Sequence, residues 1–146
     1  MCFNVFVPKG ILPDVSNIEI TGGTFYSYGN ITRDVNLSSG TLSGNSTISS
    51  NVTLTSSLSN IIRADSGNLT LSNLIISGLA TVSSSIGSKI IASNLIANLS
   101  NTSTRFINLN YTGTITPGFK EILDYGNSSV ELNDFKLNSL NLAANQ

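Results

Sequence analysis

The stretch that decides the fold runs from residue 17 to residue 72 and reads NIEITGGTFYSYGNITRDVNLSSGTLSGNSTISSNVTLTSSLSNIIRADSGNLTLS. Written in rows of seventeen residues, it repeats one motif in phase: Asn or Asp, an aliphatic residue, any residue, an aliphatic residue, and Ser or Thr. The copies of this motif cover residues 17–21, 34–38, 51–55 and 68–72. Four copies at one spacing indicate a structural repeat.

The aliphatic residues of the chain alternate with small polar residues, which is typical of β-strands with one buried face. This alternation changes phase at Asn and Asp, as where Leu69 and Leu71 are followed by Asn73 and then by Leu74 and Ile76. Asn and Asp tolerate the backbone of a sharp corner. The hairpin dipeptides Asn-Gly and Asp-Gly are absent from the sequence. The pattern therefore predicts strands joined by corners in a coil, and not a meander of hairpins.

Seventeen residues at about 3.3 Å each make a closed turn of roughly 56 Å, which is enough for three short strands and three corners. We therefore predict an all-β, single-domain parallel β-helix (β-solenoid) of about seven turns. The stacked Asn, Ser and Thr side chains are expected to form hydrogen-bonded ladders. The aliphatic pairs of the motif are expected to stack inward in two columns: Ile18, Val35, Val52 and Leu69 in one, and Ile20, Leu37, Leu54 and Leu71 in the other.

Two segments depart from the repeat. Phe119, Ile122 and Leu123 are spaced as on one face of a helix, and Gly126 follows them, so we predict a short helical excursion near 118–125. The segment 1–13 carries apolar residues and two prolines and is predicted to be an N-terminal cap strand. The solenoid domain is then expected to occupy residues 14–146.

Composition argues against an enzyme. The 146 residues include no His and one Cys, which removes the side chains of imidazole, thiolate–imidazole and zinc chemistry. Among the eight acids, Asp65 lies beside Arg63, and Glu121 and Asp124 lie on the wet side of the predicted helix; we interpret both groups as solvated charges. We therefore predict no catalytic, cofactor-binding or metal-binding residues, and no cofactor.

Charge and hydropathy also limit the partners. A net charge of −1 with seven Lys and Arg lacks the basic footprint that nucleic acids require. No apolar run reaches the roughly 18 residues of a membrane span, so we expect a chain that is not integral to a membrane. The opening MCFNVFVPKG does not read as a signal peptide. A virion, a cell surface and a cytoskeletal filament all remain open as locations.

Two resemblances bear on function. The string SGNLTLSNLIISG at 66–78 resembles the repeats of secreted haemagglutinin and autotransporter β-helices, which are adhesins. The seventeen-residue turn resembles that of bactofilins, cytoskeletal β-helices that polymerise end to end, and viral fibre segments are similar to the same degree. The first resemblance implies binding of glycans, and the second implies self-assembly.

The leading functional hypothesis is a non-enzymatic structural β-solenoid that self-assembles into a fibre, filament or shell, with other copies of the chain as its partners. The alternative is a cell-surface or virion adhesin that binds glycans along one face of the rod. Unpaired strand edges at the ends of a solenoid tend to pair with other chains. The predicted assembly residues are Phe3, Val5 and Val7 near the N-terminus and Leu137, Leu140 and Leu142 near the C-terminus.

Overall fold

The structure, a computed structural model, describes residues 4–7, 17–55, 60–97, 107–112, 121–129 and 135–140; for 4–7 and 135–140 it describes the backbone strands alone. All regular elements in these ranges are strands, and none is a helix. The strands are β1 (Asn4–Val7), β2 (Asn17–Ile20), β3 (Thr24–Ser27), β4 (Asn30–Ile31), β5 (Asp34–Leu37), β6 (Gly40–Gly44), β7 (Thr47–Leu54), β8 (Asn60–Ala64), β9 (Leu69–Ile76), β10 (Ala80–Ser85), β11 (Ile90–Ala97), β12 (Ile107–Thr112), β13 (Leu123–Ser128) and β14 (Phe135–Leu140).

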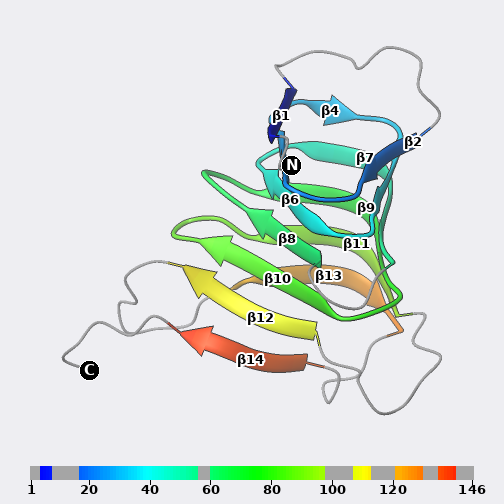
Figure 1. Cartoon of the computed structure of the whole chain (residues 1–146). Coiled ribbons are helices and arrows are strands. Elements are labelled where there is room, and N and C mark those ends of the chain that lie inside the picture. The colour runs from blue at the N-terminus through cyan, green and yellow to red at the C-terminus, as the bar shows by residue number, and fades with distance from the viewer. Residues whose placement is uncertain are drawn as a thin grey trace.

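The strands form two parallel sheets that the chain visits in turn (Figure 1). The first sheet has the order β1-β3-β6-β8-β10-β12-β14, and its strands lie side by side from the top to the bottom of the view. We call each strand position along the coil a rung. The second sheet has the order β2-β5-β7-β9-β11-β13, with β4 also paired to β7. Since every pairing is parallel, each return to a sheet requires a crossover through the other sheet, which is the coil of a β-solenoid.

About four turns form the regular coil, from β2 through β5, β7 and β9 to β11. The prediction of about seven turns is not supported. Strands β12, β13 and β14 pair onto the stack. Residues 98–106 precede β12 in the sequence, and residues 113–122 precede β13. Connections of this length interrupt the short, even corners on which a constant period depends.

The seventeen-residue register holds over the first three copies of the motif. Val35 pairs with Ile18 on one side and with Val52 on the other. The fourth copy leaves this register, because Val52 pairs with Leu74, 22 residues further along, and not with Leu69. The predicted continuation of the column to Leu69 is therefore wrong.

The displaced leucines are buried all the same, because a bend at Asn73 turns the aliphatic residues on both of its sides inward. Leu71 pairs with Ile48 across β7 and β9, and Leu69 pairs with Ile90 of β11. Both halves of β9 thus carry an inward pair of aliphatic side chains. Alternation alone could not decide which pair stacks on β7, since either pair fills the core.

The core is the continuous aliphatic interior between the sheets. Of the eight predicted inward residues, all except Ile18 are buried to 5% exposure or less, and Ile18 is partly buried against the others. From the first sheet, Phe25, Leu42, Ile62 and Val82 continue one inward column. Full burial of a side chain of this size stabilises the fold by about 1.5 to 3 kcal/mol, so the stacked columns are the main source of stability.

The predicted helix is wrong where it can be compared with the structure. Residues 123–125 belong to β13, which pairs in parallel with β11, so that Leu123 lies opposite Ile90. The helical spacing covers only a few residues, and a helix this short is marginal by itself. Pairing with the edge of β11 gives the same segment a row of backbone hydrogen bonds. Residues 118–120 lie outside the described part of the chain, as does most of the predicted cap, of which β1 pairs with β3.

Candidate functional site

Asparagine side chains stack in a hydrogen-bonded ladder along the second sheet, as the sequence predicted. Asn51, Asn73, Asn94 and Asn127 occupy the same register position in β7, β9, β11 and β13, and we call them the asparagine ladder. The Nδ2 of Asn73 donates to the Oδ1 of Asn51 at 2.8 Å, that of Asn94 to Asn73 at 2.8 Å, and that of Asn127 to Asn94 at 3.2 Å. The side-chain amides therefore all point in one direction along the rod.

Asp34 stands one rung before the asparagine ladder. Its Oδ1 accepts a hydrogen bond from the backbone N–H of Asn51 at 3.0 Å and another from the hydroxyl of Ser50. These donors favour the charged form, so they hold the pKa of the Asp34 carboxyl below its ordinary value, with the Ser50 hydroxyl as the largest cause. Each amide Nδ2 points toward the preceding asparagine, so the donor end of the ladder faces Asp34. The negative charge of Asp34 is therefore at the end where hydrogen-bond donors point.

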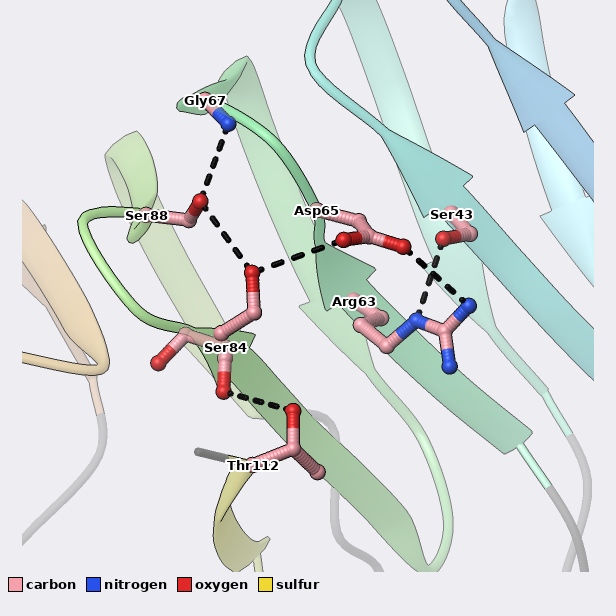
Figure 2. Close-up of polar contacts among 8 residues, drawn as sticks. Ser43, Arg63, Asp65, Gly67, Ser84, Ser88 and Thr112 are labelled. Atoms are coloured by element: carbon pink, nitrogen blue, oxygen red, sulfur yellow. Dashed lines mark hydrogen bonds and ion pairs between the residues drawn. The ribbon is translucent and has the colours of Figure 1, made fainter. Parts of the chain in front are cut away.

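A second polar cluster lies at the corner that follows the first sheet (Figure 2). The Nε of Arg63 donates to the Oγ of Ser43 at 3.2 Å, and its Nη2 lies 3.5 Å from the Oδ2 of Asp65. Both charged side chains are about one-third exposed. The predicted solvated pair of Arg63 and Asp65 is confirmed, and an exposed pair of this kind adds little to stability.

The turn between β10 and β11 is tied to the neighbouring rungs by hydroxyl groups (Figure 2). The Oγ of Ser85 lies 3.5 Å from the Oδ1 of Asp65 and 3.3 Å from the Oγ of Ser88. The Oγ of Ser88 accepts from the backbone N–H of Gly67 at 2.9 Å, and the Oγ1 of Thr112 donates to the carbonyl of Ser84 at 3.3 Å. This turn is therefore held in a defined position.

Lys89 ends the same turn and forms ion pairs with both predicted acidic residues, Glu121 and Asp124. Its Nζ lies 2.7 Å from the Oε2 of Glu121 and 3.1 Å from the Oδ2 of Asp124, and its backbone N–H donates to the Oδ1 of Asn68 at 3.2 Å. The hydrogen bonds that the Lys89 ammonium donates to Glu121 and, to a smaller extent, to Asp124 raise the pKa of Lys89. Glu121 and Asp124 are solvent-facing, as predicted, but Glu121 lies just before β13 and Asp124 lies within it, and neither is on a helix.

An open pocket of about 420 Å³ lies beside this turn, and we call it the corner pocket. Its lining residues are Asn68, Ile86, Gly87, Ser88, Lys89, Tyr111 and Glu121. Ile86 is 62% exposed, whereas Tyr111 is 4% exposed. The corner pocket thus combines a carboxylate, an ammonium, an amide and hydroxyls with an exposed aliphatic side chain.

Sequence reasoning missed the corner pocket. The structure places Ile86 on the turn between β10 and β11, where its side chain is exposed. Gly87 was the sequence signal for a turn at this point, because it ends the strand pattern. Its positive φ of 71° in the structure is the conformation that glycine favours.

The predicted assembly residues fall into two distant groups. Val5 and Val7 belong to β1, and Leu137 and Leu140 belong to β14, at opposite ends of the first sheet. Phe3 and Leu142 lie outside the described residues. One chain therefore does not bring the two groups together.

The described ranges hold no group of three or more His, Cys, Asp or Glu side chains placed to bind a metal ion. They also contain no helix of the length and apolarity needed to cross a bilayer. The likeness to bactofilins, adhesin repeats and viral fibres rests on period and composition alone. Comparison with known proteins finds no family model, no curated protein and no solved structure that matches this chain.

Proposed function

We propose that this chain is a non-enzymatic structural rod that assembles end to end into a fibre, filament or shell. The observation that supports the proposal is the strand order of the first sheet, in which β1 and β14 are the two outer strands. Within the described part of the chain, β1 pairs with β3 alone and β14 with β12 alone. Unpaired strand edges of this kind are ready templates for another chain.

The direction of the strands decides the geometry of such an assembly. All strands of the first sheet run parallel. A second copy that places its β1 against β14 therefore continues the sheet with the same polarity. That contact joins two different surfaces, so it repeats without closing and generates a filament. Phe3, Val5 and Val7 of one copy would meet Leu137, Leu140 and Leu142 of the next.

The exposed end of the second sheet supports the same proposal. Tyr125 of β13 lies in register with Ala92 of β11 and Leu71 of β9, both of which are buried core residues. Tyr125 continues this inward column but is 40% exposed. An aromatic ring in a core position that stays open to solvent is a surface that another copy can cover.

Electron microscopy and light scattering of the purified full chain over a range of concentrations test this proposal. We expect filaments whose mass grows with concentration. The variant Leu140→Lys with Leu142→Lys should remain monomeric while keeping the circular dichroism spectrum of the parent, because two ammonium groups at the interface repel the apolar strand of the next copy.

A matched control adds the same charge elsewhere. Thr53 and Ile75 form a pair in the second sheet and are partly exposed, so Thr53→Lys with Ile75→Lys places two lysines on the side of the rod. This control should assemble like the parent. A parent chain that stays monomeric at high concentration would contradict the proposal, and an end variant that assembles as well as the parent would contradict the interface.

A further inference from the structure

The asparagine ladder ends in an open hydrogen-bond acceptor on β13. Asn127 occupies the last position and donates through its Nδ2 to the Oδ1 of Asn94. Within the described part of the chain, β13 pairs with β11 alone, and Asn127 is exposed. No described residue donates to the Oδ1 of Asn127. Because its Nδ2 points back along the rod, this amide oxygen lies toward the free edge of β13 as an unused acceptor.

Asn17 stands at the same position at the other end of the second sheet. It lies in register with Asp34 of β5, which is the rung before Asn51. Asn17 is exposed, and among the described strands β2 is paired in this sheet with β5 alone. The side chain of Asn17 forms no hydrogen bond with the described residues. Its amide therefore offers unused donors at the opposite end of the same column.

The direction of the ladder decides which ends can meet. At each contact the Nδ2 of the later residue donates to the Oδ1 of the earlier one. A second copy that continues the rod beyond β13 places its Asn17 next, so that the Nδ2 of Asn17 can donate to the Oδ1 of Asn127 in the same sense. Two identical ends would reverse the direction of the ladder at the contact. The ladder therefore fits a head-to-tail contact between parallel strands.

The sequence around β2 is that of a strand that stacks within the ladder. Residues 15–20 read VSNIEI, residues 71–76 read LSNLII and residues 92–97 read ASNLIA. The last two segments belong to β9 and β11, which pair with each other so that their asparagines lie opposite one another. Strand β2 thus carries the motif of a ladder rung, although it is the first strand of the second sheet.

A second polar contact lies two residues further along these strands. Glu19 is exposed on β2, and Ser129 is exposed just after β13. The Oγ of Ser129 accepts from the backbone N–H of Ala97 at 2.9 Å, so its own O–H group is still available as a donor. With Asn17 opposite Asn127, Glu19 of the next copy lies opposite Ser129. A carboxylate is a strong acceptor for this hydroxyl.

We propose that the edge of β13 in one copy pairs in parallel with the edge of β2 in the next, and that Asn127 and Asn17 set the register by continuing the asparagine ladder across the contact. A slip of one residue would place Asn127 opposite Ile18 and leave both amides without partners. This contact lies in the second sheet, beside the contact of β14 with β1 in the first. The inference rests on the proposed end-to-end assembly.

Disulfide cross-linking of the assembled full chain tests the register while keeping both amides. In a Cys2→Ser background, one preparation carries Glu19→Cys and another carries Ser129→Cys. Opposite residues of neighbouring strands lie about 4.8 Å apart, within the Cα distance that a disulfide spans. The two preparations are mixed under conditions in which light scattering shows assembly and are oxidised with copper phenanthroline. We expect a cross-linked dimer in the mixture and almost none in either preparation alone.

Substitutions of Asn17 test the amide itself. Asn17→Asp places an acceptor opposite the Oδ1 of Asn127 and should raise the protein concentration needed for assembly about tenfold. Asn17→Ala removes the donor without adding charge and should raise this concentration about threefold or more. The matched control Asn68→Asp adds the same charge at an exposed asparagine in the middle of the rod and keeps the oxygen that accepts from the Lys89 backbone. It should assemble like the parent, and thermal melts by circular dichroism show that each variant is folded.

The possible failures are distinguishable. Assembly of the mixture without the cross-link between positions 19 and 129 would overturn this inference and leave the proposed end-to-end assembly standing. Equal assembly of the parent and both Asn17 variants would do the same. Cross-linked dimers in the Glu19→Cys preparation alone would show that identical ends meet, which contradicts the direction of the ladder. A parent chain that stays monomeric at high concentration would overturn both proposals.

Discussion

At the scale of single residues, the asparagine ladder is the feature that the sequence predicted best. The change of phase at Asn73 was assigned to a polar corner and stacked Asn side chains were expected to form ladders, and the amide of Asn73 is indeed joined to those of Asn51 and Asn94. The preference of Asn for a bend is local, whereas the hydrogen bonds of the ladder join residues 21 to 33 positions apart. The stacking partners were less predictable, since the register depends on the lengths of distant turns.

Removing one amide from the middle of the ladder should destabilise the fold. Asn73→Ala leaves the Oδ1 of Asn51 and the Nδ2 of Asn94 without their partners at a partly buried corner. We expect a loss of about 1 to 3 kcal/mol in the free energy of unfolding, measured by urea denaturation. The control Asn36→Ala breaks an exposed hydrogen bond to Glu19 and should cost less than about 0.5 kcal/mol. Equal losses in the two variants would show that the ladder does not stabilise the rod.

Asp34 should make stability depend on pH in acid. Its pKa is lower in the folded protein than in the unfolded chain, so its contribution is present above the unfolded value and is lost as the pH falls through the folded value. Asp34→Asn lacks this titration and keeps an oxygen that can accept from the Asn51 backbone.

The comparison is therefore between the parent and Asp34→Asn in urea at pH 6 and at pH values from about 4 downward, near and below the ordinary pKa of Asp. The stability advantage of the parent should shrink steadily as the pH falls. A constant difference across this range would contradict the proposed role of the Asp34 carboxylate.

At the scale of elements, the sequence predicted the strands between residues 17 and 54 and failed where tertiary contacts decide. Strict alternation and a constant spacing predicted β2, β5 and β7 with their pairing. The segment that became β13 has no such alternation, and five of its six residues are exposed. Its strand structure comes from the backbone of β11, which a local pattern cannot report.

The backbones of β3 and β6 approach each other closely at Gly44. A Cβ at Gly44 would lie 1.9 Å from the carbonyl oxygen of Ser27, and the φ of Gly44 is 142°. Gly44→Ala should therefore destabilise the protein by about 2 kcal/mol or more, because two backbones must separate. A Cβ at Gly22 meets nothing within 4 Å, so Gly22→Ala should be nearly neutral in the same thermal or urea melt. A tolerated Gly44→Ala would mean that the rungs at this corner are further apart than described.

At the scale of the whole molecule, the candidate sites depend on how the turns stack. The ends of the first sheet could be anticipated, because any coil of parallel strands has two free edges. The corner pocket could not, since it requires the β10–β11 turn, Tyr111 of β12 and Glu121 to meet after connections of unequal length. The spacing of motifs in the sequence predicts the regular turns of the coil, but it does not predict where longer connections interrupt them.

The stacking of successive turns is the basis of the proposed assembly, and methyl NOE spectra of the selectively labelled protein test it most directly. The structure places Val35 beside Val52, Val52 beside Leu74, and Leu74 beside Leu95. We predict NOEs between the methyl groups of each of these pairs. A strong NOE between Val52 and Leu69 in place of Val52 and Leu74 would contradict the observed register, and Hα–Hα NOEs typical of antiparallel pairs would contradict the parallel coil itself.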